Sequence, residues 1–123
     1  MYEDARGQCP DGVASVIREL SPLHLSGWLA DAARTAPMLL DVREPAEFAY
    51  CHIAGSRHVP MARLAAVIDE LPDDAAIVCI CHHGVRSRQA ASVLCAHGFH
   101  QVFNLSGGID AWARQVDRTM ERY

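Results

Sequence analysis

Short apolar runs bounded by turn residues define the strands that the sequence predicts. The strongest run, Ala75–Cys81, is rich in β-branched residues and apolar at consecutive positions, which is typical of a strand covered on both faces in the centre of a sheet. Shorter segments predict further strands at Met38–Val42, Arg57–Val59 and Gln101–Leu105.

Between these strands, apolar residues recur every three or four positions, which is the spacing of one helical face. The clearest case is residues 61–71, with Asp69 and Glu70 on the opposite face. Strands that alternate with helices of this length form βαβ units, so we expect an α/β fold with a largely parallel sheet covered on both faces. The other predicted helices run from Ser26, as N-cap, to the residues before Pro37, over residues 46–50, over Ser87–His97, and around Ile109, Trp112 and Val116.

The length of 123 residues suits one domain, whose folding should bury roughly two-thirds of the surface that the unfolded chain exposes. Residues 1–19 mix charge, glycine and proline with one short apolar patch, Val13–Ile17. We interpret residues 1–19 as a peripheral N-terminal extension and residues 20–123 as the folded domain.

Composition and charge argue against two classes of partner. Half of the residues are hydrophobic, but no run approaches the roughly 20 apolar residues that cross a bilayer. The 11 basic residues are all arginines, they are scattered, and the formal net charge is -4, so there is no basic stripe for a nucleic-acid backbone. The N-terminus is acidic and polar, unlike a secretory signal. We therefore expect a cytoplasmic protein that binds neither membranes nor nucleic acid.

The cysteines are odd in number and irregularly spaced, which is not the pattern of a disulfide framework. In a reducing compartment they should be free thiols. Cys79 lies close to Cys81, His82 and His83, but a strand does not easily wrap such neighbours around one ion. We therefore expect neither a metal nor another cofactor. The cysteines are Cys9, Cys51, Cys79, Cys81 and Cys95.

Cys81 occupies a position where parallel sheets commonly bind ligands. It ends the strongest predicted strand and precedes a loop and a helix from about Ser87, so backbone amides and the positive helix terminus should face its sulfur. Arg86 could add a positive charge, and Gly84 permits a tight turn. We therefore expect Cys81 to ionise readily and act as a nucleophile; the alternative is a buried cysteine that only packs.

Four segments, in this order along the chain, resemble the motifs of single-domain rhodaneses. The loop Cys81–Ser87 (CHHGVRS) is similar to the C-x-x-G-x-R-S active-site loop of that family. The resemblance covers about residues 20–115. The other three similar segments are Asp41–Phe48 (DVREPAEF), His52–Ser56 (HIAGS) and Leu105–Trp112 (LSGGIDAW).

The resemblance implies a central, mostly parallel five-stranded sheet and a sulfurtransferase that works in two steps. Cys81 would take the outer sulfur of a donor, such as thiosulfate, a small persulfide or a protein persulfide, and pass it to cyanide or a thiol. The oligomeric state is left open. The loop residues implied to contact the substrate are His82, His83, Gly84, Val85, Arg86 and Ser87.

Two charged residues at the end of a neighbouring strand are expected to support this loop. Asp41 can accept N–H bonds, and Arg43 can pair with Glu44 or Glu47. The two imidazoles of the loop should make it weakly cationic at neutral pH.

Two other functions stay open. Phosphatases and arsenate reductases related to this fold use a cysteine loop that ends in arginine after five intervening residues, whereas four residues separate Cys81 from Arg86. A loop that is one residue shorter should form a narrower ring of backbone amides around the sulfur. Such a ring suits one sulfur atom better than a tetrahedral oxyanion. A non-enzymatic rhodanese-like binding module is the second alternative, against which the presence of Cys81 argues. Cys51, where the family usually has glycine, is a candidate second redox thiol, although an inert thiol is the commoner case.

Overall fold

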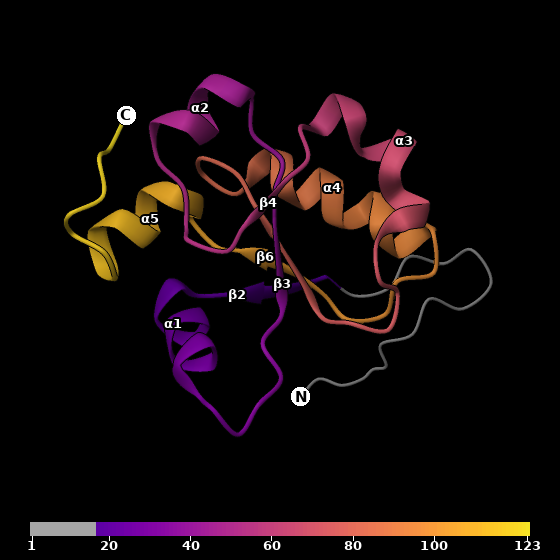
Figure 1. The fold of residues 1–123 in the computed structure, drawn as a ribbon, viewed down its shortest axis with the longest axis horizontal. Helices are drawn as coiled ribbons and strands as arrows, with labels where there is room; N and C mark the ends of the chain where they lie inside the picture. The colour runs from indigo at the N-terminus through magenta and orange to yellow at the C-terminus, as the bar shows by residue number, and fades with distance from the viewer. Residues whose placement is uncertain (1–16) are drawn as a thin grey trace.

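The computed structural model describes residues 17–123, which form one five-stranded sheet with helices on both faces (Figure 1). Every strand pairing is parallel, and the strand order is β2-β6-β5-β3-β4. The central position of β5 and the parallel α/β architecture confirm the fold class predicted from the sequence. The strands are β2 (Arg18–Leu20), β3 (Met38–Asp41), β4 (Arg57–His58), β5 (Ile77–Ile80) and β6 (Val102–Leu105).

The helices cover the sheet in two groups, with α3 and α4 packed over one face and α1 and α5 over the other (Figure 1). The helices predicted over residues 46–50 and 87–97 are both present. Within residues 17–123, none of the helices is both long and apolar enough to cross a membrane. The helices are α1 (Pro22–Ala30), α2 (Pro45–Tyr50), α3 (Leu64–Val67), α4 (Val85–Ala96) and α5 (Gly108–Gln115).

The first helix starts before its predicted N-cap, so that prediction is wrong. Ser21, and not Ser26, caps α1: its hydroxyl accepts a hydrogen bond from the amide of His24 at 3.1 Å. Pro22 favours this start because its fixed φ and missing N–H suit the first position of a helix. The helix ends at Ala30, earlier than the pattern of apolar residues suggests.

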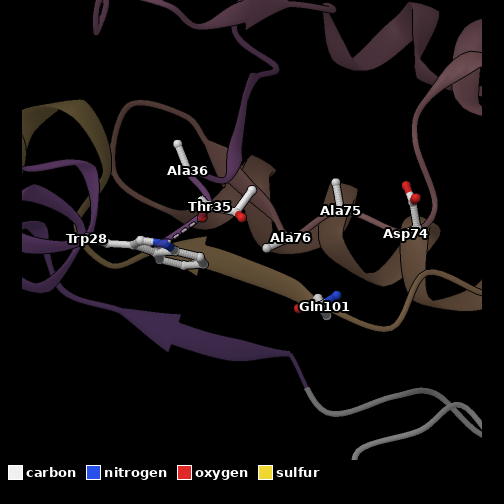
Figure 2. Close-up of a pocket in the computed structure, with 7 residues that line it drawn as sticks. All are labelled: Trp28, Thr35, Ala36, Asp74, Ala75, Ala76 and Gln101. Atoms are coloured by element: carbon white, nitrogen blue, oxygen red, sulfur yellow. Dashed lines mark hydrogen bonds between the residues drawn. The ribbon is translucent and has the colours of Figure 1, made fainter. Parts of the chain in front are cut away.

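A small pocket of about 250 Å³ lies beside α1 (Figure 2). The indole Nε1 of Trp28 donates a hydrogen bond to the carbonyl of Thr35 at 3.0 Å in its wall. Most of the other lining residues precede β3, β5 and β6, so the pocket lies at the N-terminal edge of the sheet, opposite to the edge where Cys81 follows β5. These residues are Ala36, Asp74, Ala75, Ala76 and Gln101.

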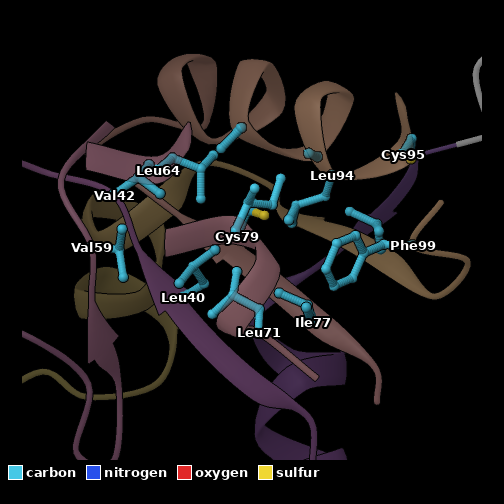
Figure 3. Packing of buried hydrophobic residues seen from close by; sticks show 14 of the residues in the cluster. Leu40, Val42, Val59, Leu64, Leu71, Ile77, Cys79, Leu94, Cys95 and Phe99 are labelled. Carbon is cyan, nitrogen blue, oxygen red and sulfur yellow. The ribbon is translucent and has the colours of Figure 1, made fainter. Parts of the chain in front are cut away.

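Side chains of the central strand alternate between the two core clusters. Cys79 points into the cluster under α4, together with Leu40 and Leu94 (Figure 3), whereas Val78 faces the cluster under α1 and α5. Burial raises the pKa of Cys79, so at neutral pH it stays a thiol. Cys79 therefore packs as a small apolar side chain in the centre of the core.

The segment predicted as one helix over residues 61–71 consists of three short pieces. Hydrogen bonds between residues three apart, such as that from the Arg63 amide to the Pro60 carbonyl at 2.7 Å, tighten its ends into 3-10 turns. The buried face is nevertheless the predicted one, since Leu64 and Ile68 both lie in the core. The pieces are η2 (Met61–Arg63), α3 and η3 (Ile68–Glu70).

The sequence pattern does not predict the edge strand β2. Its three residues pair with β6, and Leu20 lies opposite Leu105. β2 therefore crosses the proposed boundary between an extension (residues 1–19) and a domain (residues 20–123), and that division stays a prediction. The apolar patch Val13–Ile17 lies outside the described residues except for Ile17, which packs against the core.

Candidate active site

Cys81 lies at the carboxyl edge of the sheet, directly after β5, and is only 1% exposed. The amide of Gly84 donates a hydrogen bond to its Sγ at 3.1 Å, and the hydroxyl oxygen of Ser87 lies 3.2 Å from the same sulfur. α4 begins at Val85, so the positive end of its dipole follows the loop at once. The structure therefore brings the thiol, an amide donor and a hydroxyl together in one loop.

The loop turns at Gly84, whose φ of +98° lies in the left-handed region. A Cβ at this position would also sit 3.3 Å from the carbonyl oxygen of Leu105. Both constraints favour glycine, which explains its place in the loop. Val85, the next residue, is 62% exposed, and of the other predicted contact residues His83 is exposed as well.

The start of α5 holds the Cys81 loop from the other side. The amide of Ile109 donates to the carbonyl of Cys81 at 2.8 Å, and the amide of Asp110 donates to the carbonyl of His82 at 3.1 Å. Gly108 permits this approach, because a Cβ there would lie 2.3 Å from the Cys81 carbonyl oxygen. The motif Leu105–Trp112 includes Gly108, but only the structure shows the contact with the Cys81 loop that requires a glycine at this position.

Arg86 is paired with a carboxylate of α2. Its guanidinium donates two parallel hydrogen bonds to Glu47, at 2.9 and 3.0 Å, and the two side chains are 35% and 21% exposed. The hydrogen bonds from Arg86 lower the pKa of Glu47 to about 2, so the carboxylate is ionised over the whole neutral range. The positive charge of Arg86, which was expected near Cys81, is therefore partly neutralised by the carboxylate of Glu47.

Asp41 and Arg43 form a fully buried ion pair behind the loop. Arg43 donates to both carboxylate oxygens of Asp41, with Nη2 at 2.7 Å, and also to the carbonyl of Cys51 at 2.6 Å. The predicted pairing of Arg43 with Glu44 or Glu47 is found only at the backbone: Nη1 donates to the carbonyl of Glu47 at 3.3 Å, whereas the Glu47 carboxylate binds Arg86. Asp41 also accepts a hydrogen bond from the Arg43 amide at 3.1 Å, in the segment that follows its own strand, and its support of the Cys81 loop stays a prediction.

The side chain of Tyr123 contacts Arg43, Glu47 and His82. No pattern in the sequence predicts a role for this residue at the site. Its hydroxyl accepts a hydrogen bond from Arg43 at 2.9 Å and donates one to Glu47 at 3.1 Å. Its ring stacks on His82, which in turn stacks on His83. Burial and the neighbouring His83 lower the pKa of His82, so this imidazole adds less positive charge to the loop at neutral pH than an unperturbed histidine would.

Within residues 17–123, His82, His83 and Asp110 place possible metal-ligand atoms within 4.8 Å of one another. The carboxylate of Asp110, however, forms ion pairs with Arg114 and Arg122, each at 3.2 Å. The two imidazole rings face each other in a stack with centroids 4.0 Å apart. This arrangement is that of an ion-paired and stacked surface rather than of a coordination shell.

Cys51 and Cys81 belong to different sides of the core. Cys81 is part of the cluster under α4, whereas Cys51 packs against the cluster under α1 and α5. The contact that links Cys51 to the candidate site is its backbone carbonyl, which binds Arg43. The packing therefore favours the interpretation of Cys51 as an inert thiol.

The chain matches a family model described as the rhodanese-like domain over residues 25–115. It is 38% identical over 99 residues to a sulfurtransferase of Allochromatium vinosum, a match that covers 80% of this chain and 91% of that protein. It is 41% identical over 75 residues to the thiosulfate sulfurtransferase GlpE of Pseudomonas fluorescens, covering 61% of this chain and 69% of that protein.

Among solved structures, a rhodanese-related protein from Thermoplasma volcanium superposes with a TM-score of 0.72 and 30% identity, over 80% of this chain and 93% of that one. A longer relative is the probable adenylyltransferase/sulfurtransferase MoeZ of Mycobacterium tuberculosis. The identity is 33% over 126 residues, and the match covers 99% of this chain but only 32% of the length of that protein.

Replacing Gly108 should disturb the site more than replacing another glycine of positive φ. Gly108→Ala should lower the free energy of unfolding by well over about 2 kcal/mol, because backbone strain is joined by the clash with the Cys81 carbonyl. Gly98→Ala, where a Cβ meets nothing within 4 Å, should cost only about 1–2 kcal/mol. Urea unfolding measures both, and equal losses would contradict a tight contact between α5 and the loop.

The Glu47–Arg86 pair should stabilise the fold in a pH-dependent way. The pKa of Glu47 in the fold is about 2, against an ordinary value of 4.5, so its contribution is complete above about pH 4.5 and is lost as the pH falls through about 2. Because both side chains are partly exposed, Glu47→Gln should cost about 1 kcal/mol at pH 6.5.

This cost should shrink steadily below pH 4.5 in urea-unfolding measurements. Glu70→Gln, a change at an exposed glutamate, is the control and should stay within about 0.5 kcal/mol of the original chain throughout. A cost for Glu47→Gln that is unchanged between pH 6.5 and pH 2.5 would argue against the ion pair.

Proposed function

This chain belongs to the rhodanese-like domain family, as its four motifs predicted, and we propose that it moves a sulfane sulfur from a donor to a thiophilic acceptor through a persulfide on Cys81. The names of its relatives support sulfur transfer as the class of reaction. The donor, the acceptor and the part played by Cys81 are the proposal.

The surroundings of the Cys81 sulfur are the observation that carries this proposal. The sulfur accepts a hydrogen bond from the Gly84 amide, lies beside the Ser87 hydroxyl, and sits in front of the positive end of α4. The amide and the helix terminus stabilise a thiolate, and they would also stabilise the anionic outer sulfur of a persulfide.

The proposed reaction has two steps, each of which exchanges one bond to sulfur. The Cys81 thiolate attacks the outer sulfur of thiosulfate, an S–S bond to Cys81 forms, the original S–S bond breaks, and sulfite leaves with the electron pair. An acceptor such as cyanide or a thiolate then attacks the terminal sulfur, and the Cys81 thiolate is released. Covalent catalysis of this kind divides one difficult transfer into two easier ones and predicts ping-pong kinetics.

The arrangement of Arg86 favours sulfur transfer over phosphoester or arsenate chemistry. In phosphoester or arsenate chemistry the nucleophile attacks the central atom of the oxyanion, so a guanidinium is needed to bind the oxygens on that atom, whereas in thiosulfate the attacked outer sulfur carries no oxygens. Arg86 instead donates two hydrogen bonds to Glu47, and only four residues separate it from Cys81. We propose that backbone amides, with a lesser contribution from Arg86, hold the transferred sulfur.

The partners that we propose are a small sulfur donor and a small thiol or cyanide acceptor, with a protein persulfide as a further possible donor. The near-complete burial of Cys81 suits a reaction in which a single atom is passed. We also propose a cytoplasmic location, because the described cysteines are free thiols, as is usual in a reducing compartment.

A thiosulfate-to-cyanide transfer assay, run beside a phosphatase assay on the same preparation, tests this function. The original chain should produce thiocyanate. Cys81→Ser should abolish the activity without unfolding the domain, since the hydroxyl is nearly isosteric but far less nucleophilic at neutral pH. Cys51→Ser, the matched control, should retain most activity.

Three results would contradict the proposal. Phosphatase activity without sulfur transfer would favour a phosphatase or arsenate reductase of the related type. Silence in both assays with every donor and acceptor would favour a binding module. A Cys51→Ser variant as inactive as Cys81→Ser would require a mechanism with two thiols.

A further inference from the structure

A chain of hydrogen bonds connects the buried sulfur of Cys81 to the carboxylate of Glu19 at the edge of the sheet. The Ser87 hydroxyl lies 3.2 Å from Cys81 Sγ and is hydrogen-bonded to Asn104 Oδ1. Asn104 Nδ2 donates to the two carboxylate oxygens of Glu19, at 3.1 and 3.3 Å. Ser87 and Asn104 are fully buried, whereas Glu19 lies on β2 and is partly exposed.

The neighbours of Asn104 determine which way its amide points. Nδ2 faces two acceptors, the Glu19 carboxylate and the Gly84 carbonyl, the latter at 3.2 Å. A flipped amide would turn Oδ1 toward both acceptors, so Oδ1 faces Ser87. Partial burial opposes the ionisation of Glu19, but hydrogen bonds from Arg88 and other neighbours lower its pKa, so it remains an anionic acceptor at neutral pH.

This orientation decides what Ser87 can offer to Cys81. Ser87 has one hydroxyl hydrogen, and Asn104 Oδ1 can only accept, so the hydrogen is donated to Asn104. A lone pair of Ser87 is then turned toward Cys81. This lone pair can accept a hydrogen bond from the S–H of a Cys81 thiol. It disfavours a thiolate, because a thiolate is stabilised by hydrogen-bond donors.

We propose that Asn104, held in place by Glu19, is a positioning residue that controls the direction of the Ser87 hydroxyl and thereby how readily Cys81 becomes a thiolate. While the hydroxyl donates to Asn104, the thiol is favoured. When it turns to Cys81 Sγ, the thiolate gains a second donor beside the Gly84 amide, and Asn104 Oδ1 loses its own. Asn104 and the thiolate therefore compete for one hydrogen atom.

This competition matches the two states of the proposed reaction, on which the inference rests. In the persulfide the negative charge lies on the terminal sulfur, so Sγ no longer needs the Ser87 hydrogen. The hydroxyl can return to Asn104 when Cys81 is loaded and turn to the sulfur when the thiolate is regenerated. No covalent bond changes in this rotation.

Other charged and titratable groups belong to the loop and to the elements packed near Cys81, and those that interact with its sulfur influence its ionisation independently of this rotation. The hydrogen bonds that the structure describes for Ser87 and Asn104 involve none of them, so a comparison with and without the Ser87 hydroxyl separates the two effects. These groups are His82, His83 and Arg86 of the loop and α4, Glu47 of α2, Asp41 of β3 with Arg43, Cys79 of β5, and Asp110 of α5.

The rate at which iodoacetamide alkylates Cys81, followed against pH by mass spectrometry of its peptide, tests the proposal. Asn104→Leu removes the competing acceptor at similar size and should lower the midpoint of the profile by about one pH unit, as expected for one hydrogen bond to a charged group. In a Ser87→Ala background the same substitution should leave the midpoint unchanged.

Glu19→Gln supplies a second, milder variant at the sheet edge. Because a glutamine amide can donate to a flipped Asn104, this variant should shift the midpoint in the same direction by a smaller amount, and again only when Ser87 is present. The Cys51 peptide in the same samples is the internal control. If circular dichroism shows that Asn104→Leu is unfolded, Glu19→Gln carries the test alone.

Unchanged midpoints in the folded variants would overturn the proposal, and so would shifts that persist in the Ser87→Ala background. Uptake of sulfur from thiosulfate is measured separately on the original chain by intact mass. A chain that takes up no sulfur from thiosulfate or from any persulfide donor would refute the proposed function and would leave the alkylation profiles fully interpretable.

Discussion

The contact between the start of α5 and the Cys81 loop is the constraint on which the rest of the site depends. Two amides of α5 bind the carbonyls of Cys81 and His82, and Gly108 leaves no room for a side chain between them. In a trans peptide the N–H points opposite to the carbonyl, so fixing these carbonyls turns the following amides away from α5. The sheet positions the sulfur, and α5 determines the direction of the backbone amides around it.

The charged side chains around this backbone are paired with one another. The buried Asp41–Arg43 pair and the half-buried Glu47–Arg86 pair meet at the hydroxyl of Tyr123. Each guanidinium thus has its own carboxylate, so in the proposed reaction an anionic sulfur is stabilised mainly by the Gly84 amide and the start of α4, whose directions are fixed. The Ser87 hydroxyl is the one donor that we propose to turn when the charge moves between Sγ and the terminal sulfur.

The elements that the sequence predicts well are those encoded by strong local patterns. β5 was recognisable from its continuous apolar run, and the loop after it from the glycine and the following helix. β2 was not, because two of its three residues are charged and it owes its structure to pairing with β6. Contacts such as Tyr123 with Arg43, or Asn104 with Glu19, join residues 80 or more positions apart, which no local periodicity reports.

The most direct test of the central claim is the mass of the intact protein after incubation with thiosulfate and removal of excess donor. A persulfide on Cys81 predicts an increase equal to one sulfur atom, a peptide map that assigns it to Cys81, and its loss after addition of cyanide. A protein that stays unmodified with every sulfur donor, or that carries the added sulfur on another cysteine, would contradict the assignment of Cys81 as the carrier.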